Sequence, residues 1–308
     1  MRRRRERSGH SRRTPPRGVL FFWLALACAA ASGAWGQAPE SGSATLRAKY
    51  AELHDRLERN AFGRELYLAS REESGQLKGE VYGVLEFPFE QVESGLREAR
   101  SWCDVLILPF NTKHCYAEPG EAARTLAMRI GRKSEQPAEL AYPLEFKYRI
   151  VARTPEYFRA VLTADKGPIG TRDYQIALEA TPLDANRTFI HFGYAYGFSV
   201  MSRLALQAYL GTVGASKVGF TVTARDERNR PTYVGGLLGA TERNTMRYFL
   251  AIDAYLASLS VPAAARVDQR LSAWFAATER YPTQLHEMDR GEYIAMKRKE
   301  TQRSSAAL

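Results

Sequence analysis

Residues 188–210 read TFIHFGYAYGFSVMSRLALQAYL, and the first half of this stretch decides the fold. Side chains alternate from Thr188 to Phe198, so that the even-numbered residues share one face, which is rich in aromatic rings. A period of two with many aromatics predicts a long β-strand with one bulky face. The opposite face holds Gly193, Ala195 and Gly197. Such small side chains are expected on a face that another element approaches closely.

The second half of the stretch predicts a helix that follows the strand without a polar loop. Its apolar residues fall on one stripe, namely Met201, Leu204, Ala205 and Ala208. The chain thus has a series of alternating strands, and the last of them, a long one, is followed directly by a helix. This order predicts an antiparallel sheet curved around a helix. Such an arrangement leaves apolar room between the two layers.

The preceding sequence supplies the other strands of this sheet. Apolar and polar residues alternate regularly in each strand, which indicates that one face of the sheet is exposed to solvent and the other is covered. Turn residues separate the segments, as in Gly167–Gly170 and Asp184–Asn186. The expected strands are 77–87, 113–118, 124–131, 144–152, 157–164, 172–180 and 188–198, with a short extra strand at Leu66–Leu68.

Helical spacing predicts further elements around the sheet. Glycines Gly235, Gly236 and Gly239 precede the strongest helix and suggest a hinge there. The tail from Met288 onward is charged and is expected to be a frayed surface helix. The predicted helices are 45–60, 89–99, 102–106, 201–210, 241–259 and 265–279, with a hairpin from 217–223 and 231–234.

The positive charge of the chain is concentrated at its start. Residues 1–36 carry eight arginines and one glutamate, so they account for seven of the ten net positive charges. The remaining residues are nearly balanced, which argues against a nucleic-acid-binding surface.

The same N-terminal segment has the pattern of a leader. Its arginines precede an apolar run from Val19 to Ala31, and Ala34-Trp35-Gly36 predicts cleavage before Gln37. The run is shorter than the ~20 residues that span a bilayer, so a membrane anchor is less favoured. Lipid attachment at Cys28 is also less favoured, because Ala25-Leu26-Ala27 is a poor match to the usual Leu-Ala-Gly lead-in. The sequence therefore predicts export, to a periplasm.

Removal of the leader leaves two cysteines, Cys103 and Cys115. An even count in an oxidising compartment predicts a disulfide, and the alternative is a pair of buried thiols.

The order of strand, helices, six strands and helices resembles the helix-grip fold of the START-like superfamily, also called SRPBCC, with its polyketide cyclase and lipid-transfer relatives. Two stretches, 167–174 (GPIGTRDY) and 242–252 (ERNTMRYFLAI), are similar to those of exported proteobacterial members without assigned function. The resemblance spans residues 76–260. It implies an α+β fold with a curved seven-stranded antiparallel sheet around a long C-terminal helix and an apolar cavity between them, with extra helices at both ends.

The domain organisation follows from this resemblance. The expected parts are a signal peptide (1–36), a linker and N-terminal helix (37–75), a ligand-binding domain (76–260) and a C-terminal helical extension (261–308). The domain departs from the family in an insertion at 211–239, which would cover the cavity or fill it.

The sequence shows no catalytic signature such as a nucleophile elbow, a P-loop or a dinucleotide fingerprint. The five histidines are isolated and lack metal-ligand spacing, so neither a metal nor another cofactor is predicted. Glu279, His286 and Glu287 lie near one another, yet a solvated surface is the default interpretation for them.

The candidate ligand-binding residues are aromatic and basic side chains that the pattern directs toward the cavity. A cation in an apolar cavity would orient the head of an amphipathic ligand, and tyrosines combine an apolar body with a hydroxyl. Arg243, Arg247 and Asp253 lie on or beside the apolar stripe of the predicted helix 241–259. The alternatives are Arg–Asp or Arg–Glu pairs on the surface for the arginines, and ordinary core packing for the aromatics. The candidates are Tyr148, Arg172, Tyr174, Phe192, Tyr194, Tyr196, Arg243 and Arg247.

The leading hypothesis is an exported binding or carrier protein for a hydrophobic, lipid-like ligand, with transient membrane contact compatible with that role. The alternatives are a cyclase-like enzyme on a hydrophobic substrate and an envelope interaction protein whose core is filled by side chains. The sequence does not fix the oligomeric state.

Overall fold

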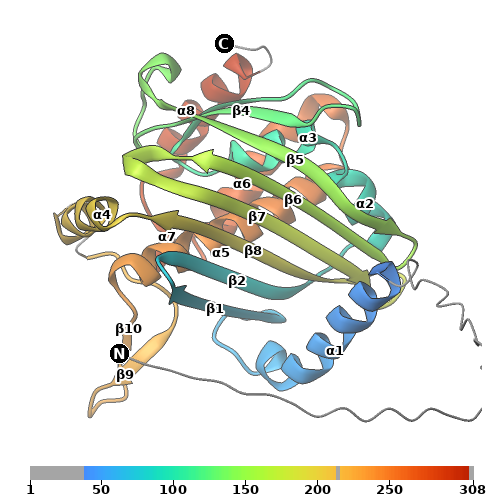
Figure 1. The fold of residues 1–308 in the computed structure, drawn as a ribbon, viewed down its shortest axis with the longest axis horizontal. Coiled ribbons are helices and arrows are strands. Elements are labelled where there is room, and N and C mark those ends of the chain that lie inside the picture. Colours follow the sequence, from blue (N-terminus) through green and yellow to red (C-terminus); the bar gives the residue numbers. More distant parts are fainter. Residues whose placement is uncertain (1–37, 213–215, 305–308) are drawn as a thin grey trace, which may run out of the picture. The chain divides into compact units, whose positions relative to one another are not determined.

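The alternating segments form one antiparallel sheet in the computed structural model, which describes residues 38–212 and 216–304. Within those residues the sheet has eight strands in the order β1-β2-β8-β7-β6-β5-β4-β3 (Figure 1). Alternation of apolar and polar residues explains why these segments form strands. In β5, for example, Leu144 and Phe146 are buried while Glu145 and Lys147 are exposed. The strands are β1 (Leu66–Glu73), β2 (Gln76–Leu85), β3 (Thr112–Tyr116), β4 (Thr125–Ile130), β5 (Tyr142–Thr154), β6 (Tyr157–Lys166), β7 (Thr171–Pro182) and β8 (Thr188–Phe198).

Helices cover both faces of this sheet. They are α1 (Ala38–Glu58), α2 (Phe89–Leu96), α3 (Ala99–Leu106), α4 (Val200–Thr212), α5 (Gly236–Ser258), α6 (Arg266–Thr278), α7 (Pro282–Leu285) and α8 (Arg290–Arg303). Short 3₁₀ turns lie at Ala138–Leu140, Pro168–Gly170 and Ala263–Ala265, and a small hairpin consists of β9 (Val222–Arg225) and β10 (Pro231–Tyr233).

The strand beyond the predicted seven is β1. The sequence predicts only a short strand at Leu66–Leu68, whereas β1 pairs with β2 along its whole length. A two-residue turn joins the strands, and both of its residues, Ser74 and Gly75, have positive φ. Turns of this kind match the twist of an antiparallel pair and therefore fix its register.

α5 is the helix that the sheet grips, and it lies against β1, β2 and β8. The bulky face of β8 meets it, since the ring centroids of Tyr194 and Tyr248 are 5.3 Å apart. α1 packs on the opposite face, where the rings of Tyr50 and Phe189 are 5.0 Å apart. This is the helix-grip arrangement, so the predicted α+β fold class is confirmed, with one strand more than expected.

The sheet and α5 approach closely at Gly79 of β2, and not on the face of β8 that carries Gly193, Ala195 and Gly197. A Cβ at Gly79 would overlap Thr245 Oγ1, whereas a Cβ at Gly193 would meet no atom within 4 Å. The expectation of a close approach at Gly193 is therefore wrong, because α5 packs on the aromatic face instead.

The C-terminal segment is a packed helix, so the prediction of a frayed surface helix is wrong. α8 buries Tyr293, Met296 and Lys297. The Lys297 ammonium donates to the carbonyl of Thr112 at 2.6 Å and to Glu300 Oε2 at 2.7 Å. Charge in this helix is thus partly internal, which composition alone does not indicate.

The apolar stripe predicted for α4 faces solvent rather than the core. Met201 is 75% exposed and Leu204 is 56% exposed. Ser202 turns inward instead, and its hydroxyl donates to the carbonyl of Gly170 at 2.7 Å. This hydrogen bond, together with the Ser199 hydroxyl at the start of the helix, fixes the rotation of α4.

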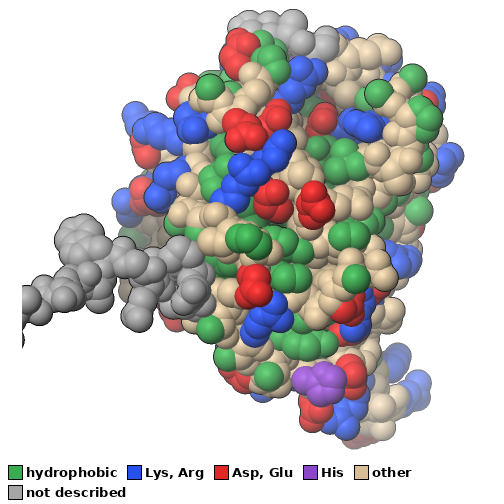
Figure 2. Space-filling view, turned by 90° about the vertical axis from the view of Figure 1, so that its right-hand side faces the viewer, with side chains coloured by type: hydrophobic (Ala, Val, Ile, Leu, Met, Phe, Trp, Pro, Cys, Tyr) green, Lys and Arg blue, Asp and Glu red, His purple; other side chains and the backbone are tan. Residues whose placement is uncertain are grey.

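The predicted leader, its cleavage site and Cys28 lie outside the described residues. Among the residues that are described, no helix combines the length and apolar character needed to cross a membrane. Figure 2 shows one face of the molecule, on which basic and acidic side chains are interspersed with apolar ones.

Candidate functional site

A cluster of tyrosines lies between the sheet and α5, and we call it the tyrosine cluster. It consists of Tyr174 from β7, Tyr194 and Tyr196 from β8, and Tyr248 from α5. Tyr174 and Tyr196 are stacked with centroids 5.5 Å apart, and Tyr194 lies 5.6 Å from Tyr196. These are contact distances for aromatic pairs, so the rings form one continuous surface.

The hydroxyls of this cluster are neutral hydrogen-bonding groups. The Tyr174 hydroxyl lies 2.8 Å from Thr171 Oγ1. Burial raises the pKa of Tyr194 well above its usual value, and it raises the pKa of Tyr248 to about 12. Near neutral pH these side chains therefore donate and accept hydrogen bonds but do not act as bases.

One side of α5 beside the cluster is partly accessible to solvent. Asn244 and Tyr248 are only partly buried, although most residues of α5 are fully buried. The two residues lie one helical turn apart, so they share a face, and Tyr248 on that face contacts Tyr194. Solvent thus reaches the helix at the point where it meets the aromatic face of the sheet.

Two arginines follow on the adjacent side of α5. Arg243 and Arg247 are only 4% and 5% exposed, so the predicted surface ion pair is not their arrangement. The Arg247 Nη2 atom lies 2.5 Å from Glu287 Oε1, and Glu287 is buried rather than solvated as the sequence suggests. Asp253, which the sequence places on or beside the same stripe of α5, pairs with Arg64 at 2.8 Å.

The other predicted site residues are distributed as follows. Phe192 is fully buried, with its ring 6.2 Å from that of Tyr248, and lies in the same row as the tyrosine cluster. Tyr148 is also buried, but its hydroxyl donates to the carbonyl of Leu96 at 3.1 Å and therefore anchors α2. The hydroxyl proton of Tyr148 is therefore already donated to the protein's own backbone.

Arg172 does not reach the covered face, so that expectation is wrong. Its side chain is 59% exposed and lies 3.3 Å from Asp173. The pairing of β7 with β8 shifts between Arg172 and Gln175, and Asp173 has a φ of 51°. A β-bulge at this point breaks the alternation, which places Arg172 and Tyr174 on opposite faces.

The outer face of the sheet carries a charged network that no sequence pattern indicates. His191 of β8, which is isolated from other histidines in the sequence, lies 2.9 Å from Glu179 through Nδ1 and 2.9 Å from Glu80 through Nε2. Burial alone would lower the pKa of His191, but these two carboxylates raise it above its usual value. The Tyr82 ring stacks on the imidazole at 4.3 Å. These residues meet only because β2, β7 and β8 are neighbours in the sheet, and a sequence pattern does not give this strand order or its register.

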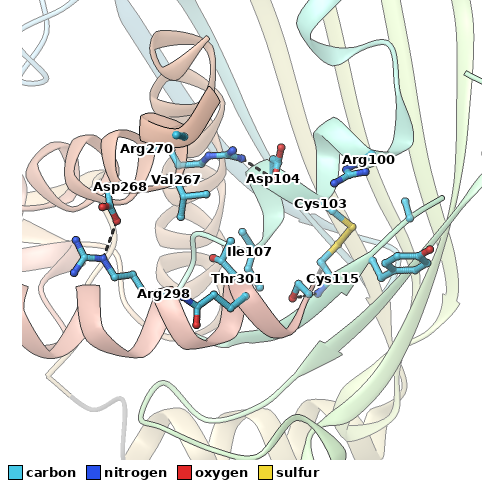
Figure 3. A pocket seen from close by; sticks show the side chains of 15 residues that line it. Arg100, Cys103, Asp104, Ile107, Cys115, Val267, Asp268, Arg270, Arg298 and Thr301 are labelled. Atoms are coloured by element: carbon cyan, nitrogen blue, oxygen red, sulfur yellow. Dashed lines mark hydrogen bonds and ion pairs between the residues drawn. A yellow bond between two sulfur atoms is a disulfide. The ribbon is translucent and has the colours of Figure 1, made fainter. Parts of the chain in front are cut away.

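The predicted disulfide between Cys103 and Cys115 is confirmed, and it joins α3 to β3. A groove of about 470 Å³ opens beside it, with further walls from α6 and α8 (Figure 3). Charged side chains that line the groove pair with one another, which leaves their charges largely neutralised. These pairs are Arg270–Asp104 at 2.7 Å and Arg298–Asp268 at 2.7 Å.

A second hollow of about 820 Å³ lies between α5, α6 and the end of β2. Alanines from the two helices form much of its floor, including Ala254, Ala257 and Ala273. Neither hollow contains a residue of the tyrosine cluster. Within residues 38–212 and 216–304, no group of three or more His, Cys, Asp or Glu side chains is placed to hold a metal ion.

Comparison with known proteins does not assign this chain to a family. No family model matches the chain, and no curated protein matches it. A conserved protein from Geobacillus kaustophilus aligns at 15% identity over 59% of this chain and 95% of its own, with a TM-score of 0.33. A norcoclaurine synthase point mutant from Thalictrum flavum aligns at 11% identity over 49% and 88%, with a TM-score of 0.31. A protein from Arthrobacter aurescens aligns at 12% identity over 63% and 92%, also with a TM-score of 0.33. Membership of the START-like superfamily stays a prediction.

Proposed function

We propose that the protein is an exported binding or carrier protein, and that its hydrophobic, lipid-like ligand lies beside the tyrosine cluster between the sheet and α5. The observation that carries this proposal is the partial burial of Asn244 and Tyr248 on the face of α5 that meets Tyr194. The partial exposure of this face beside aromatic rings gives a ligand a route of approach from solvent. Aromatic walls with a few hydrogen-bonding groups are typical of small-molecule sites.

Export is supported by the disulfide between Cys103 and Cys115, since such bonds persist in oxidising compartments. Binding is favoured over catalysis because burial keeps the hydroxyls of Tyr194 and Tyr248 neutral, and a neutral phenol is a poor general base.

Native mass spectrometry of protein purified from a periplasm, followed by organic extraction, tests the proposal. We expect a mass above that of the mature chain and release of a hydrophobic compound. Tyr194→Ala should change the amount or kind of that compound while leaving the chain folded. Gly193→Ala is the matched control, because its new Cβ lies on the opposite face of β8 with no atom within 4 Å.

The competing interpretation is a filled core. In that case Tyr194→Ala would lower the free energy of unfolding by roughly 3–5 kcal/mol, as aromatic truncation in a packed core does. That loss, together with a wild-type mass equal to that of the mature chain alone, would exclude the carrier role.

A further inference from the structure

Basic side chains from three segments gather around Glu287. Arg247 comes from α5, Lys133 from the loop after β4, and Lys217 from the segment before β9. Their nitrogens lie 2.5 Å, 2.5 Å and 3.6 Å from the carboxylate oxygens of Glu287. A single carboxylate thus has three cationic partners, and the side chain of Glu287 is only 7% exposed.

Arg243 adds a fourth positive charge without a counterion of its own. It precedes Arg247 by about one turn of α5 and is 4% exposed. Its Nε and Nη1 atoms are buried and have no hydrogen-bond partner among the residues that the structure describes. Burial and the neighbouring Arg247 lower its pKa to about 10, so the guanidinium stays charged near neutral pH. Buried donors without a partner are rare in folded proteins because each costs desolvation energy.

The neighbouring Glu242 does not satisfy these donors. Its Oε2 atom accepts from the backbone N–H groups of Phe220 at 2.6 Å and Thr221 at 2.9 Å. Its Oε1 atom accepts from the hydroxyls of Ser70 at 2.8 Å and Thr221 at 2.6 Å. Glu242 therefore holds the β1 edge and the segment before β9, while Arg243 keeps free N–H groups.

We propose that Arg243, Lys133 and Lys217 form an anion site that binds the acidic head, a carboxylate or phosphate, of the ligand beside the tyrosine cluster. This inference rests on the proposed function, because it assigns the polar end of the same ligand. The free Nε–H and Nη1–H of Arg243 bind the anionic oxygens. Lys133 and Lys217 are more exposed, and they add positive charge on the solvent side. Glu287 positions Arg247 and both lysines.

The apolar end of the ligand follows from the position of Arg243 on α5. Arg243 immediately precedes Asn244, and Arg247 immediately precedes Tyr248, whose ring lies 5.3 Å from that of Tyr194. A ligand whose head is held by Arg243 would therefore lay its apolar part along Tyr248 and Tyr194. The preferred ligand class is an amphipathic acid, not a neutral lipid.

Matched ligands test this inference with the mature chain. Hexadecanoate, hexadecyl phosphate and hexadecanol share one chain and differ in the head, while inorganic phosphate has a head alone. The wild type should bind the two acids at least about tenfold more tightly than the alcohol, the range expected for charge-assisted hydrogen bonds. Arg243→Met should abolish that preference and keep the affinity for hexadecanol.

Two further variants keep the test independent of folding. Lys133→Gln with Lys217→Gln changes partly exposed side chains and should reduce the preference for acids without loss of structure. Arg270→Met removes another buried arginine, which pairs with Asp104 and not with Glu287, and should leave the preference unchanged.

The outcomes separate the two proposals. Equal binding of acids and alcohol by the wild type, or an unchanged preference in Arg243→Met, would overturn the anion site and leave the carrier role intact. Absence of binding by all three chain ligands would overturn the proposed carrier role. Inorganic phosphate then decides the anion site: a rise in melting temperature of the wild type but not of Arg243→Met supports it, and an equal response overturns it.

Discussion

Replacement of Glu300 by Gln tests whether buried charge holds α8 against the sheet. The Glu300 carboxylate accepts from Lys113 Nζ at 3.0 Å through Oε1 and from Lys297 Nζ at 2.7 Å through Oε2. The side chains of both lysines are 0% exposed, and that of Glu300 is 4% exposed. Glu300→Gln keeps the shape of the side chain but leaves two buried ammonium groups without a counterion. Removal of one partner from a buried pair costs about 3–5 kcal/mol, and we expect a loss of this size.

Urea unfolding of the mature chain at neutral pH measures this loss. The matched control is Glu135→Gln, which removes the exposed partner of Lys299 on the same helix. Exposed pairs contribute little to stability, so the control should unfold like the wild type. If Glu300→Gln is no less stable than Glu135→Gln, buried charge does not hold α8 and the reasoning is refuted.

The pH dependence of the same cluster gives a second measurement. Burial lowers the pKa of Lys297 from 10.5 to about 8 in the folded state. Between those two pH values the unfolded chain binds the proton and the folded chain does not, so the free energy of unfolding rises with pH. Lys297→Met removes this contribution. The stability of the wild type relative to Lys297→Met should therefore increase from pH 8 to pH 10.5, and a flat difference would contradict the burial of a charged Lys297.

Three other outcomes are expected. Gly79→Ala should lower the free energy of unfolding by about 1–3 kcal/mol, as overpacking does, while Gly193→Ala should leave it unchanged in the same urea titration. His191→Gln should cost more stability near ~pH 5.5 than near ~pH 8.5, because the raised pKa of His191 makes its contribution complete at low pH and lost as pH rises through that value. An equal cost at both pH values would show that His191 is not charged between Glu80 and Glu179. N-terminal sequencing should find Gln37 first, thiol reagents should label neither Cys103 nor Cys115 without reductant, and reduction should cost roughly 3 kcal/mol, whereas labelling of both would argue against the disulfide in the exported protein.

The sequence predicts the strands and α5 because their signals are local. Alternation in β5 and β8 and the apolar stripe of α5 each depend on residues within one element. The strand β1 is only partly anticipated, since its polar half, from Ser70 to Glu73, pairs with β2 but lacks an apolar alternation. Pairing with a neighbour, and not its own pattern, makes that half a strand.

Errors arise where one residue changes the direction of those that follow. The bulge at Asp173 turns Arg172 away from Tyr174, although a strict period of two assigns them to one face. The hydrogen bond from Ser202 to Gly170 likewise rotates α4 so that its apolar stripe faces solvent. Neither the backbone conformation of Asp173 nor a contact between residues 32 positions apart is visible in a hydrophobic pattern.

The charged clusters were the least predictable part, because their members are distant in sequence. Arg243 and Arg247 are candidates from their place on α5, but Lys133, Lys217 and Glu287 come from three connecting segments. Such segments have no periodicity, so nothing in their sequence indicates that they meet. The same holds for Glu80, Glu179 and His191, which only the strand order brings together.

The two buried charge clusters differ in a way that bears on function. At α8 every ammonium has acceptors, since Lys113 and Lys297 each donate to a backbone carbonyl as well as to Glu300. This satisfies the rule that buried charge is stable when its hydrogen bonds are complete. At Arg243 the rule is broken, although Met or Leu at that position of α5 would pack without the cost of a buried charge. Local rules are most often broken at functional sites, where a ligand supplies what the protein lacks. An anionic oxygen would complete the free donors of Arg243, which is why the inference of an acidic ligand rests on this residue and not on the balanced cluster at α8.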